Sequence, residues 1–266
     1  MPTPSLIRRA HGPVTLVEGA DGPVRFGFTE RAGGVSAAPF TSLNLGSHVG
    51  DDPVAVGENR RRALAALGAD RAAARLIVPR QVHGDRVVTV GEASPAAIAR
   101  ARAEAAAGAD AVVCTAPGVP VMLCFADCVP VVLTCGDAFA IAHSGWKGTI
   151  ARIAAATARA LAAAVGRPVA DVRAYLGPHI LGDEYEVSPE LMARFAAAFT
   201  AVRPAAAAGS RLLDLSACIL EALADAGVPR ANAVDPGLST VRGNDRFYSY
   251  RSEGGRTGRH AAIAIM

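Results

Sequence analysis

The stretch PVVLTCGDAFAIAHSG, residues 130–145, decides the fold. Two apolar runs lie on either side of Gly136-Asp137, a dipeptide that favours the tight turn of a β-hairpin. The middle of the chain is therefore predicted to hold two adjacent antiparallel strands. Strands joined by so short a turn favour an α+β sandwich over a doubly wound parallel fold.

Further segments with strand-forming composition occur on both sides of this hairpin. RLIVPRQVHGDRVVTV (75–90) predicts two strands around a Gly84-Asp85 turn. DAVVC (110–114) and VPVMLCFA (119–126) predict one short strand each, and HAAIAIM (260–266) predicts a buried strand.

Helices are predicted by capping residues and by alanine-rich runs. Asp52-Pro53, Ser188-Pro189 and Asp214 suit helix starts, and Gly68 and Gly227 suit helix ends. The alanine-rich tracts 96–107 and 154–164 are helical in character, whereas 204–208, which begins at Pro204, predicts a surface loop. We expect one domain over residues 1–266, an α/β sandwich with mixed, largely antiparallel sheets flanked by helices.

Composition excludes several classes of protein. Lys and Arg number 27 against 24 Asp and Glu, and they form no dense patch of the kind that binds nucleic acid. The first twenty residues lack the apolar run of a secretory signal, and no apolar run approaches the roughly 18 residues of a membrane span. The five cysteines are an odd number in apolar surroundings, which favours a reduced, cytoplasmic protein without disulfides.

Three residues are candidates for chemistry because each lies at the end of an apolar segment: His83, Cys128 and His143. Taken singly, such residues are more often structural than functional. If they converge, two chemistries fit. They are the ligand set of a catalytic zinc with an open fourth position, or a cysteine nucleophile with a histidine base. Cys114, Cys135 and Cys218 are predicted to be core residues, and the absence of a C-x-x-C pair argues against a structural zinc knuckle.

Two further segments suit an anion. In AHSGWKGT (142–149), Gly145 and Gly148 allow a close backbone approach, Lys147 adds positive charge, and a helix is predicted to start at about Thr149. Arg31 lies near the start of a long loop, residues 29–46, and its forked guanidinium suits phosphate or carboxylate. The alternatives are a solvated Lys147 and a surface ion pair at Arg31. Trp146 is predicted to be either a core residue or a wall of the pocket.

Seven motifs together resemble one bacterial family, from about residue 25 to the end of the chain. They are FTERAGGVS (28–36), SLNLGSHVGDDPVAVGENR (42–60), RQVHGDRV (80–87), ADCVPV (126–131), AHSGWKGT (142–149), GPHILGDEYEV (177–187) and FYSYRSEGGRTGR (247–259). The sequence is similar to the family called multicopper polyphenol oxidase or laccase-like. Its members are also described as purine nucleoside phosphorylases with adenosine deaminase activity, and as peptidoglycan editing factors.

This resemblance implies a fold similar to the Cys-His catalytic domain of bacterial necrotizing toxins. It also implies a zinc site (copper in older descriptions) at His83, Cys128 and His143, with Arg31 and Asn44 at the substrate. A true laccase is excluded by count, because six histidines without a His-x-His pair are too few for a multicopper cluster. Where many relatives have cysteines before Tyr185, this chain has Asp183-Glu184, so no role of those cysteines applies here. His179 is a further candidate.

The function implied by the resemblance is phosphorolysis of adenosine, inosine and methylthioadenosine, together with deamination of adenosine. The partners would then be a purine nucleoside and phosphate, the latter held by Arg31, Lys147 and the helix start near Thr149. Asp127, Glu184 and Glu186 are candidates for the proton carrier of deamination. Two other functions remain open: a Cys-His hydrolase acting on a peptidoglycan precursor with Cys128 as nucleophile, and a non-catalytic binding factor in cell-wall editing.

Overall fold

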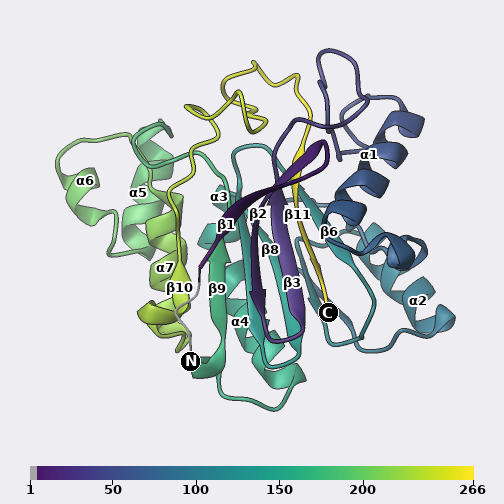
Figure 1. Cartoon of the computed structure of the whole chain (residues 1–266). Coiled ribbons are helices and arrows are strands. Elements are labelled where there is room, and N and C mark those ends of the chain that lie inside the picture. Colours follow the sequence, from purple (N-terminus) through teal and green to yellow (C-terminus); the bar gives the residue numbers. More distant parts are fainter. Residues whose placement is uncertain (1–4) are drawn as a thin grey trace.

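The computed structural model describes residues 5–266, and its centre is a pair of stacked β-sheets (Figure 1). One sheet is antiparallel throughout and has the order β1-β2-β3-β11-β6. Its strands are β1 (Ile7–His11), β2 (Val14–Asp21), β3 (Val24–Thr29), β11 (His260–Ile265) and β6 (Val121–Phe125).

The second sheet has the order β10-β9-β7-β8-β5-β4 and is mixed. Its strands are β10 (Ala233–Val234), β9 (Arg173–Leu176), β7 (Val129–Cys135), β8 (Ala138–Ser144), β5 (Ala111–Cys114) and β4 (Val87–Val90). Only the two outermost pairings, β10 with β9 and β4 with β5, are parallel. The predicted α+β sandwich with largely antiparallel sheets is confirmed.

The β7–β8 hairpin forms as predicted and lies at the centre of the second sheet. Its register runs from Val129↔Ser144 to Cys135↔Ala138, and Gly136 in the turn has a φ of 59°, which suits glycine. Both faces of the hairpin are buried because helices cover one face and the other sheet covers the second. Leu133 and Ala140 pack towards the helices, whereas Val132 packs towards the first sheet.

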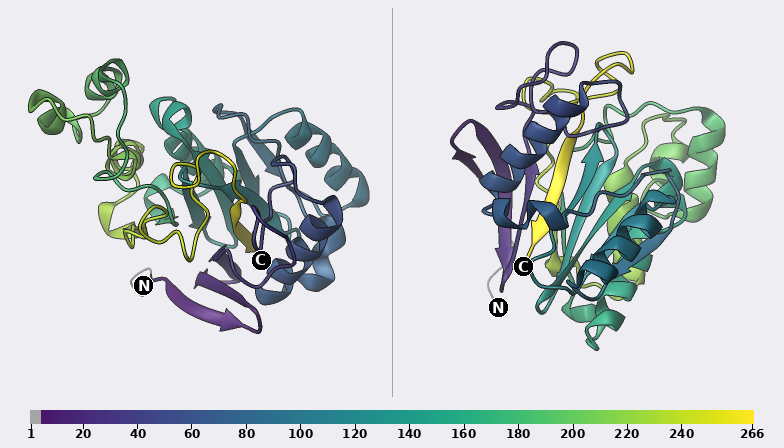
Figure 2. Two further views of the ribbon diagram at one scale, coloured as in Figure 1. Left: turned by 90° about the horizontal axis from the view of Figure 1, so that it is seen from above. Right: turned by 90° about the vertical axis from the view of Figure 1, so that its right-hand side faces the viewer.

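Helices complete the outer layers, as the two views of Figure 2 show. The outer face of the second sheet packs against α4 (Ile153–Ala164), α5 (Pro189–Ala198) and α7 (Leu215–Asp225). The outer face of the first sheet packs against α1 (Pro53–Ala66) and the 3-10 turn Asp70–Arg75. Shorter or peripheral elements are α2 (Pro95–Ala106), α3 (Trp146–Ile150), α6 (Arg203–Ala207) and the 3-10 turns Val169–Asp171 and Arg230–Asn232.

Local signals for helix ends are confirmed. Asp52 and Ser188 accept hydrogen bonds from the first-turn amides of α1 and α5, with proline at the next position, and Asp214 caps α7. Cys114, Cys135 and Cys218 are buried, as expected. No helix within residues 5–266 is long and apolar enough to cross a membrane.

Three local predictions are wrong. Residues 75–90 do not form a hairpin: β4 is the one strand there, Ile77 makes a single bridge to Val121, and β4 pairs with β5 instead. The tract after Pro204 lies in the helix α6, consistent with the high helix propensity of alanine. The helix expected at Thr149 starts at Trp146, after Gly145 as N-cap, and Arg152 with a φ of 58° separates this short α3 from α4.

Candidate functional site

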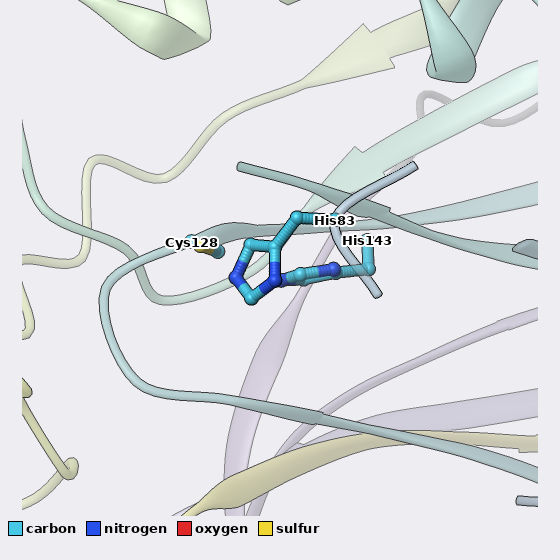
Figure 3. Close-up of side chains that lie close together, drawn as sticks. All are labelled: His83, Cys128 and His143. Carbon is cyan, nitrogen blue, oxygen red and sulfur yellow. The ribbon is translucent and has the colours of Figure 1, made fainter. Parts of the chain in front are cut away.

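Three side chains lie close together, as Figure 3 shows: His83, Cys128 and His143. Their possible ligand atoms all lie within 4.8 Å of one another, and the two imidazole centroids are 4.8 Å apart. His143 lies near the end of β8, and Cys128 lies in the link that crosses from β6 to β7. These two are neighbours because β7 and β8 pair, with Pro130 opposite His143. His83 comes from the segment that precedes β4.

Asp110 holds two of the three residues in place and was not among the candidates. Its Oδ1 lies 2.8 Å from Nδ1 of His143, and both side chains are buried. The same carboxylate accepts the backbone N–H of His83 (2.9 Å) and those of Val82 (3.1 Å) and Gly84 (2.7 Å). A carboxylate can only accept, so Nδ1 of His143 is the donor and its Nε2 is left for another partner.

This capture of consecutive amides explains why the predicted hairpin at Gly84-Asp85 does not form. The backbone donors that a second strand would need are bound to the Asp110 side chain. His83 adopts a φ of 58°, a region that residues other than glycine rarely enter. Such strain is typical of functional sites whose surroundings hold the backbone in place. The sequence signal was a single acidic residue directly before the buried strand β5.

Gly145 gives the cluster room. A Cβ atom at this position would lie 2.8 Å from Sγ of Cys128 and 3.3 Å from Cδ2 of His83. The sequence predicts that this glycine lets the backbone approach a ligand, whereas in the structure it lets two side chains of the cluster approach the backbone.

Electrostatics favour a thiolate at Cys128. Burial raises the pKa of this thiol, but the imidazoles of His143 and His83 outweigh that effect and bring the pKa to about 6. Burial alone would lower the pKa of His143, because it disfavours the charged imidazolium. The Cys128 sulfur and the Asp110 carboxylate outweigh burial and raise this pKa to about 9. A thiolate beside imidazoles can either bind a metal ion or act as a nucleophile.

The cluster lies in the wall of a pocket of about 580 Å³, within the usual range for small-molecule sites. Aromatic and apolar groups contribute much of its lining, including Phe125, Trp146, Tyr185 and Tyr250. Its other lining residues are His48, Gln81, His83, Cys124, Ala126, Asp127, Cys128, His143, Ile180, Arg251 and Arg259. Trp146 lines the pocket and also packs against the helical core, so both of its predicted roles apply.

The structure does not bring Arg31, Asn44 or Lys147 into this lining. Arg31 pairs with Glu253 through Nη2 at 2.9 Å and lies over the ring of Tyr248. Asn44 is fully buried, and Lys147 is exposed.

The three candidate proton carriers have different surroundings. Asp127 lines the pocket, but Thr240 donates to its Oδ1 (2.7 Å) and the backbone N–H of Arg251 donates to its Oδ2 (2.6 Å). Glu184 is engaged with Ser239 and Arg242 and lies outside the lining. Glu186 is exposed and pairs with Arg211.

His179 is buried outside the pocket lining, and its Nδ1 lies 2.7 Å from the carbonyl oxygen of Gly177. Three basic residues that line the pocket, His48, Arg251 and Arg259, are not among the sequence candidates. Arg259 directly precedes β11, so the strand-end criterion that identified His83 and His143 would also have found it.

Sequence comparison gives a consistent set of relatives. The model of a family described as multi-copper polyphenol oxidoreductase laccase matches residues 25–266. A purine nucleoside phosphorylase of Pseudomonas aeruginosa is 38% identical over 247 residues, covering 91% of this chain and 93% of that protein. A purine nucleoside phosphorylase of Deinococcus radiodurans is 39% identical over 239 residues, covering 89% and 87% respectively.

Two solved structures share the fold along nearly the whole chain. The Bacillus licheniformis hypothetical protein YfiH has a TM-score of 0.86 at 30% identity, covering 97% of this chain and 98% of its own. YlmD from Geobacillus stearothermophilus has a TM-score of 0.81 at 28% identity, covering 97% of each chain.

Proposed function

The chain belongs to the multi-copper polyphenol oxidoreductase laccase family, and from this premise we propose that it is a purine nucleoside phosphorylase acting on adenosine, inosine and methylthioadenosine. The observation that carries the proposal is that relatives bearing this enzyme name match about nine-tenths of the chain. The aromatic-walled pocket beside His83, Cys128 and His143 is consistent with it, because a purine is a flat apolar ring with polar edges.

In phosphorolysis, an oxygen of inorganic phosphate bonds to the sugar carbon that carries the base. The bond from that carbon to the purine nitrogen breaks, and its electron pair leaves with the purine, which takes up a proton. Positive charge develops on the sugar, so an anion held beside it stabilises the transition state. The chain must therefore orient a nucleoside, hold phosphate next to it and exclude competing water.

We further propose that the cluster holds zinc. The donor set fits, because a Cys128 thiolate and two imidazoles are ligands that zinc prefers, and Asp110 orients the His143 ring as second partners of zinc ligands do. When bound, zinc would supply a Lewis acid and a water of lowered pKa. Copper also accepts these ligands, but the described residues contain one such three-residue group, whereas a multicopper oxidase needs several sites.

Adenosine deaminase activity is a second proposal, favoured by the same His-Cys-His group. Deamination requires a water molecule to attack the purine carbon that carries the amino group, and a proton to reach the departing ammonia. Asp127 is the one acid among the three sequence candidates that lines the pocket. Its two oxygens already accept hydrogen bonds, so its proposed part is to hold the segment at Arg251 and to polarise the site.

The competing function is a Cys-His hydrolase in which Cys128 attacks a peptidoglycan precursor. It draws on the same thiolate beside His143, but it requires an accessible sulfur without a metal. Metal content and chemical labelling therefore separate the two functions.

The test uses purified full-length protein with its metal content measured on the same sample. We expect close to one zinc per chain, and release of free base from inosine and adenosine that depends on added phosphate. Chelation and Cys128→Ala should each abolish the zinc content and the phosphate-dependent release of base. Cys218 lies in the helical core and outside the pocket lining, so Cys218→Ala should keep the zinc and the activity. If metal-loaded protein turns over no nucleoside, the phosphorylase proposal is wrong. If the protein is metal-free and is labelled at Cys128, the hydrolase is favoured.

A further inference from the structure

We propose that Arg259, together with His48, forms the phosphate subsite of this pocket, and that Asn44 positions Arg259 without contacting the substrate. The inference rests on the proposed phosphorylase function and identifies where its second substrate binds. It also assigns a different place to the anion from Arg31 and Lys147, neither of which lines the pocket.

Arg259 is charged, lines the pocket and lacks an acidic partner. No carboxylate within residues 5–266 lies within ion-pair distance of its guanidinium. Its Nη1 donates to the carbonyl oxygens of Thr257 and Gly258, both at 2.9 Å. Its Nε and Nη2 have no hydrogen-bond acceptor among residues 5–266. Asp127 is the one acidic residue in the pocket lining, and its oxygens are already engaged. An arginine with free donors in a confined pocket is suited to bind an oxyanion with paired hydrogen bonds.

The other arginines nearby are less available. Arg31 is neutralised by Glu253. Arg251 also lines the pocket, but its side chain is exposed and is held by a 3.3 Å hydrogen bond from Nη2 to the carbonyl oxygen of Glu186, so it is less firmly placed than Arg259. Arg60 donates from both Nε and Nη2 to the carbonyl oxygen of Leu45.

Local structure around Arg259 is built to fix its position. Oδ1 of Asn44 accepts the backbone N–H of Arg259 at 2.9 Å and that of Gly46 at 3.0 Å, and Leu45 N–H donates to the carbonyl oxygen of Arg259. A Cβ at Gly46 would lie 2.7 Å from Cγ of Arg259, so this glycine leaves the space that the side chain occupies. The buried Asn44 therefore joins the loop of His48 to the start of β11.

His48 lies beside Arg259 as a neutral hydrogen-bonding group, because burial and the nearby cations, Arg259 and Arg60 among them, lower the pKa of its imidazole. It lines the pocket of the cluster and also a neighbouring pocket of about 430 Å³, to which Arg60 and Arg80 contribute. No acidic side chain lines the neighbouring pocket. Negative charge is thus favoured on this side, whereas the aromatic residues Trp146 and Tyr185 offer the pocket surfaces suited to a base.

The deciding experiment separates phosphate affinity from nucleoside affinity. For Arg259→Gln we expect a rise of about 10- to 100-fold in the KM for phosphate, the loss typical of one or two charge-assisted hydrogen bonds. Arg259→Lys should fall between this variant and wild type because it keeps the charge and loses the fork. Nucleoside binding measured by calorimetry without phosphate, the zinc content and the melting temperature should stay close to wild type.

Two matched variants complete the test. Gly46→Ala keeps every charge and displaces the Arg259 side chain, so it should raise the KM for phosphate more than that for nucleoside. Lys147→Gln removes an exposed charge outside the pocket lining and should leave the KM for phosphate unchanged.

Calorimetric titration with inorganic phosphate alone distinguishes the failure of this inference from that of the proposed function. If wild type binds phosphate through Arg259 but cleaves no nucleoside, the phosphorylase proposal fails and the anion subsite stands. If wild type is an active phosphorylase and Arg259→Gln leaves both its KM for phosphate and its phosphate binding unchanged, the subsite is overturned.

Discussion

The carboxylate of Asp110 lies 2.8 Å from Nδ1 of His143, and the same carboxylate binds three consecutive backbone amides of the segment that carries His83. One buried side chain therefore sets the ring orientation of one cluster histidine and the backbone of the other. The relationship couples β8, the start of β5 and the loop before β4 at a single point.

Asp110→Asn is expected to weaken zinc binding by about 10- to 100-fold, the usual effect of removing a carboxylate that orients a metal-binding histidine. The reason is that the amide can donate as well as accept, so it no longer enforces a donor at Nδ1 of His143. Zinc affinity is measured by competition with a chelating indicator. Asp85→Asn, an exposed acid on the same segment, is the control and should bind zinc as wild type does. Equal zinc affinities for Asp110→Asn and wild type would contradict the role given to Asp110.

Gly145→Ala is expected to disrupt the cluster while leaving the protein folded. The added Cβ would lie 2.8 Å from Sγ of Cys128, closer than the two atoms tolerate, so the thiol or the backbone must shift. We expect a substoichiometric zinc content, measured by elemental analysis, with a circular dichroism spectrum like that of wild type. Gly57→Ala, where an added Cβ meets no atom within 4 Å, should keep full zinc content. Full zinc content in Gly145→Ala would show that this glycine is not required by the cluster.

The parts of the fold that were predictable depend on local chemistry. The β7–β8 hairpin follows from its turn residues, and the starts of α1, α5 and α7 follow from their caps. The hairpin predicted for 75–90 failed because its outcome depends on Asp110, 26 to 28 residues away, which binds the amides that pairing would have used.

The candidate site also contains residues that local sequence identifies and residues that depend on distant partners. His83, Cys128 and His143 lie at segment ends that composition reveals, and the family resemblance selected them together. Arg259 depends on Asn44, 215 residues away, and the availability of Arg31 depends on Glu253, 222 residues away. Pairings over such separations have no signature in a single sequence, so the free arginine and the neutralised one were not distinguishable from it.

Alkylation of Cys128 in zinc-free protein should report the lowered pKa of its thiol. Burial raises this pKa, but the nearby imidazoles bring it to about 6, so the thiolate fraction rises as pH increases through that value. The rate of reaction with iodoacetamide should therefore level off above about pH 7 instead of climbing towards pH 9, as an unperturbed thiol would. Mass spectrometry of peptides locates the label.

Two internal comparisons accompany this measurement. Cys124 lines the same pocket, but burial raises its pKa, so it should remain largely unlabelled across the range. Adding zinc should slow the alkylation of Cys128 by iodoacetamide, because the metal ion would occupy its sulfur. A rate that continues to rise through pH 8–9 would contradict the thiolate–imidazole pairing.

Glu30 should make folding stability depend on pH. Its buried carboxylate pairs with Arg8 at 2.7 Å and with Arg246 at 2.6 Å. Burial raises the pKa of Glu30, but the hydrogen bonds from both arginines outweigh it, and the net shift is downwards. A group whose pKa is lower in the folded state stabilises the fold above its unfolded pKa of about 4.3, and this contribution is lost as pH falls through the folded value.

Glu30→Gln should accordingly lower the free energy of unfolding at pH 7 by about 1–3 kcal/mol, since it leaves charged donors with a weaker acceptor. Urea denaturation of wild type and variant at pH 7 and at pH 3 measures the difference, which should shrink at the lower pH because the Glu30 carboxylate of the unfolded wild-type chain becomes protonated below its pKa of about 4.3. Glu58→Gln, whose carboxylate is partly exposed and pairs with Arg61 and Arg62 of the same helix, should change stability much less at either pH. A Glu30→Gln deficit of the same size at both pH values would show that the loss arises from packing and not from the charge of Glu30.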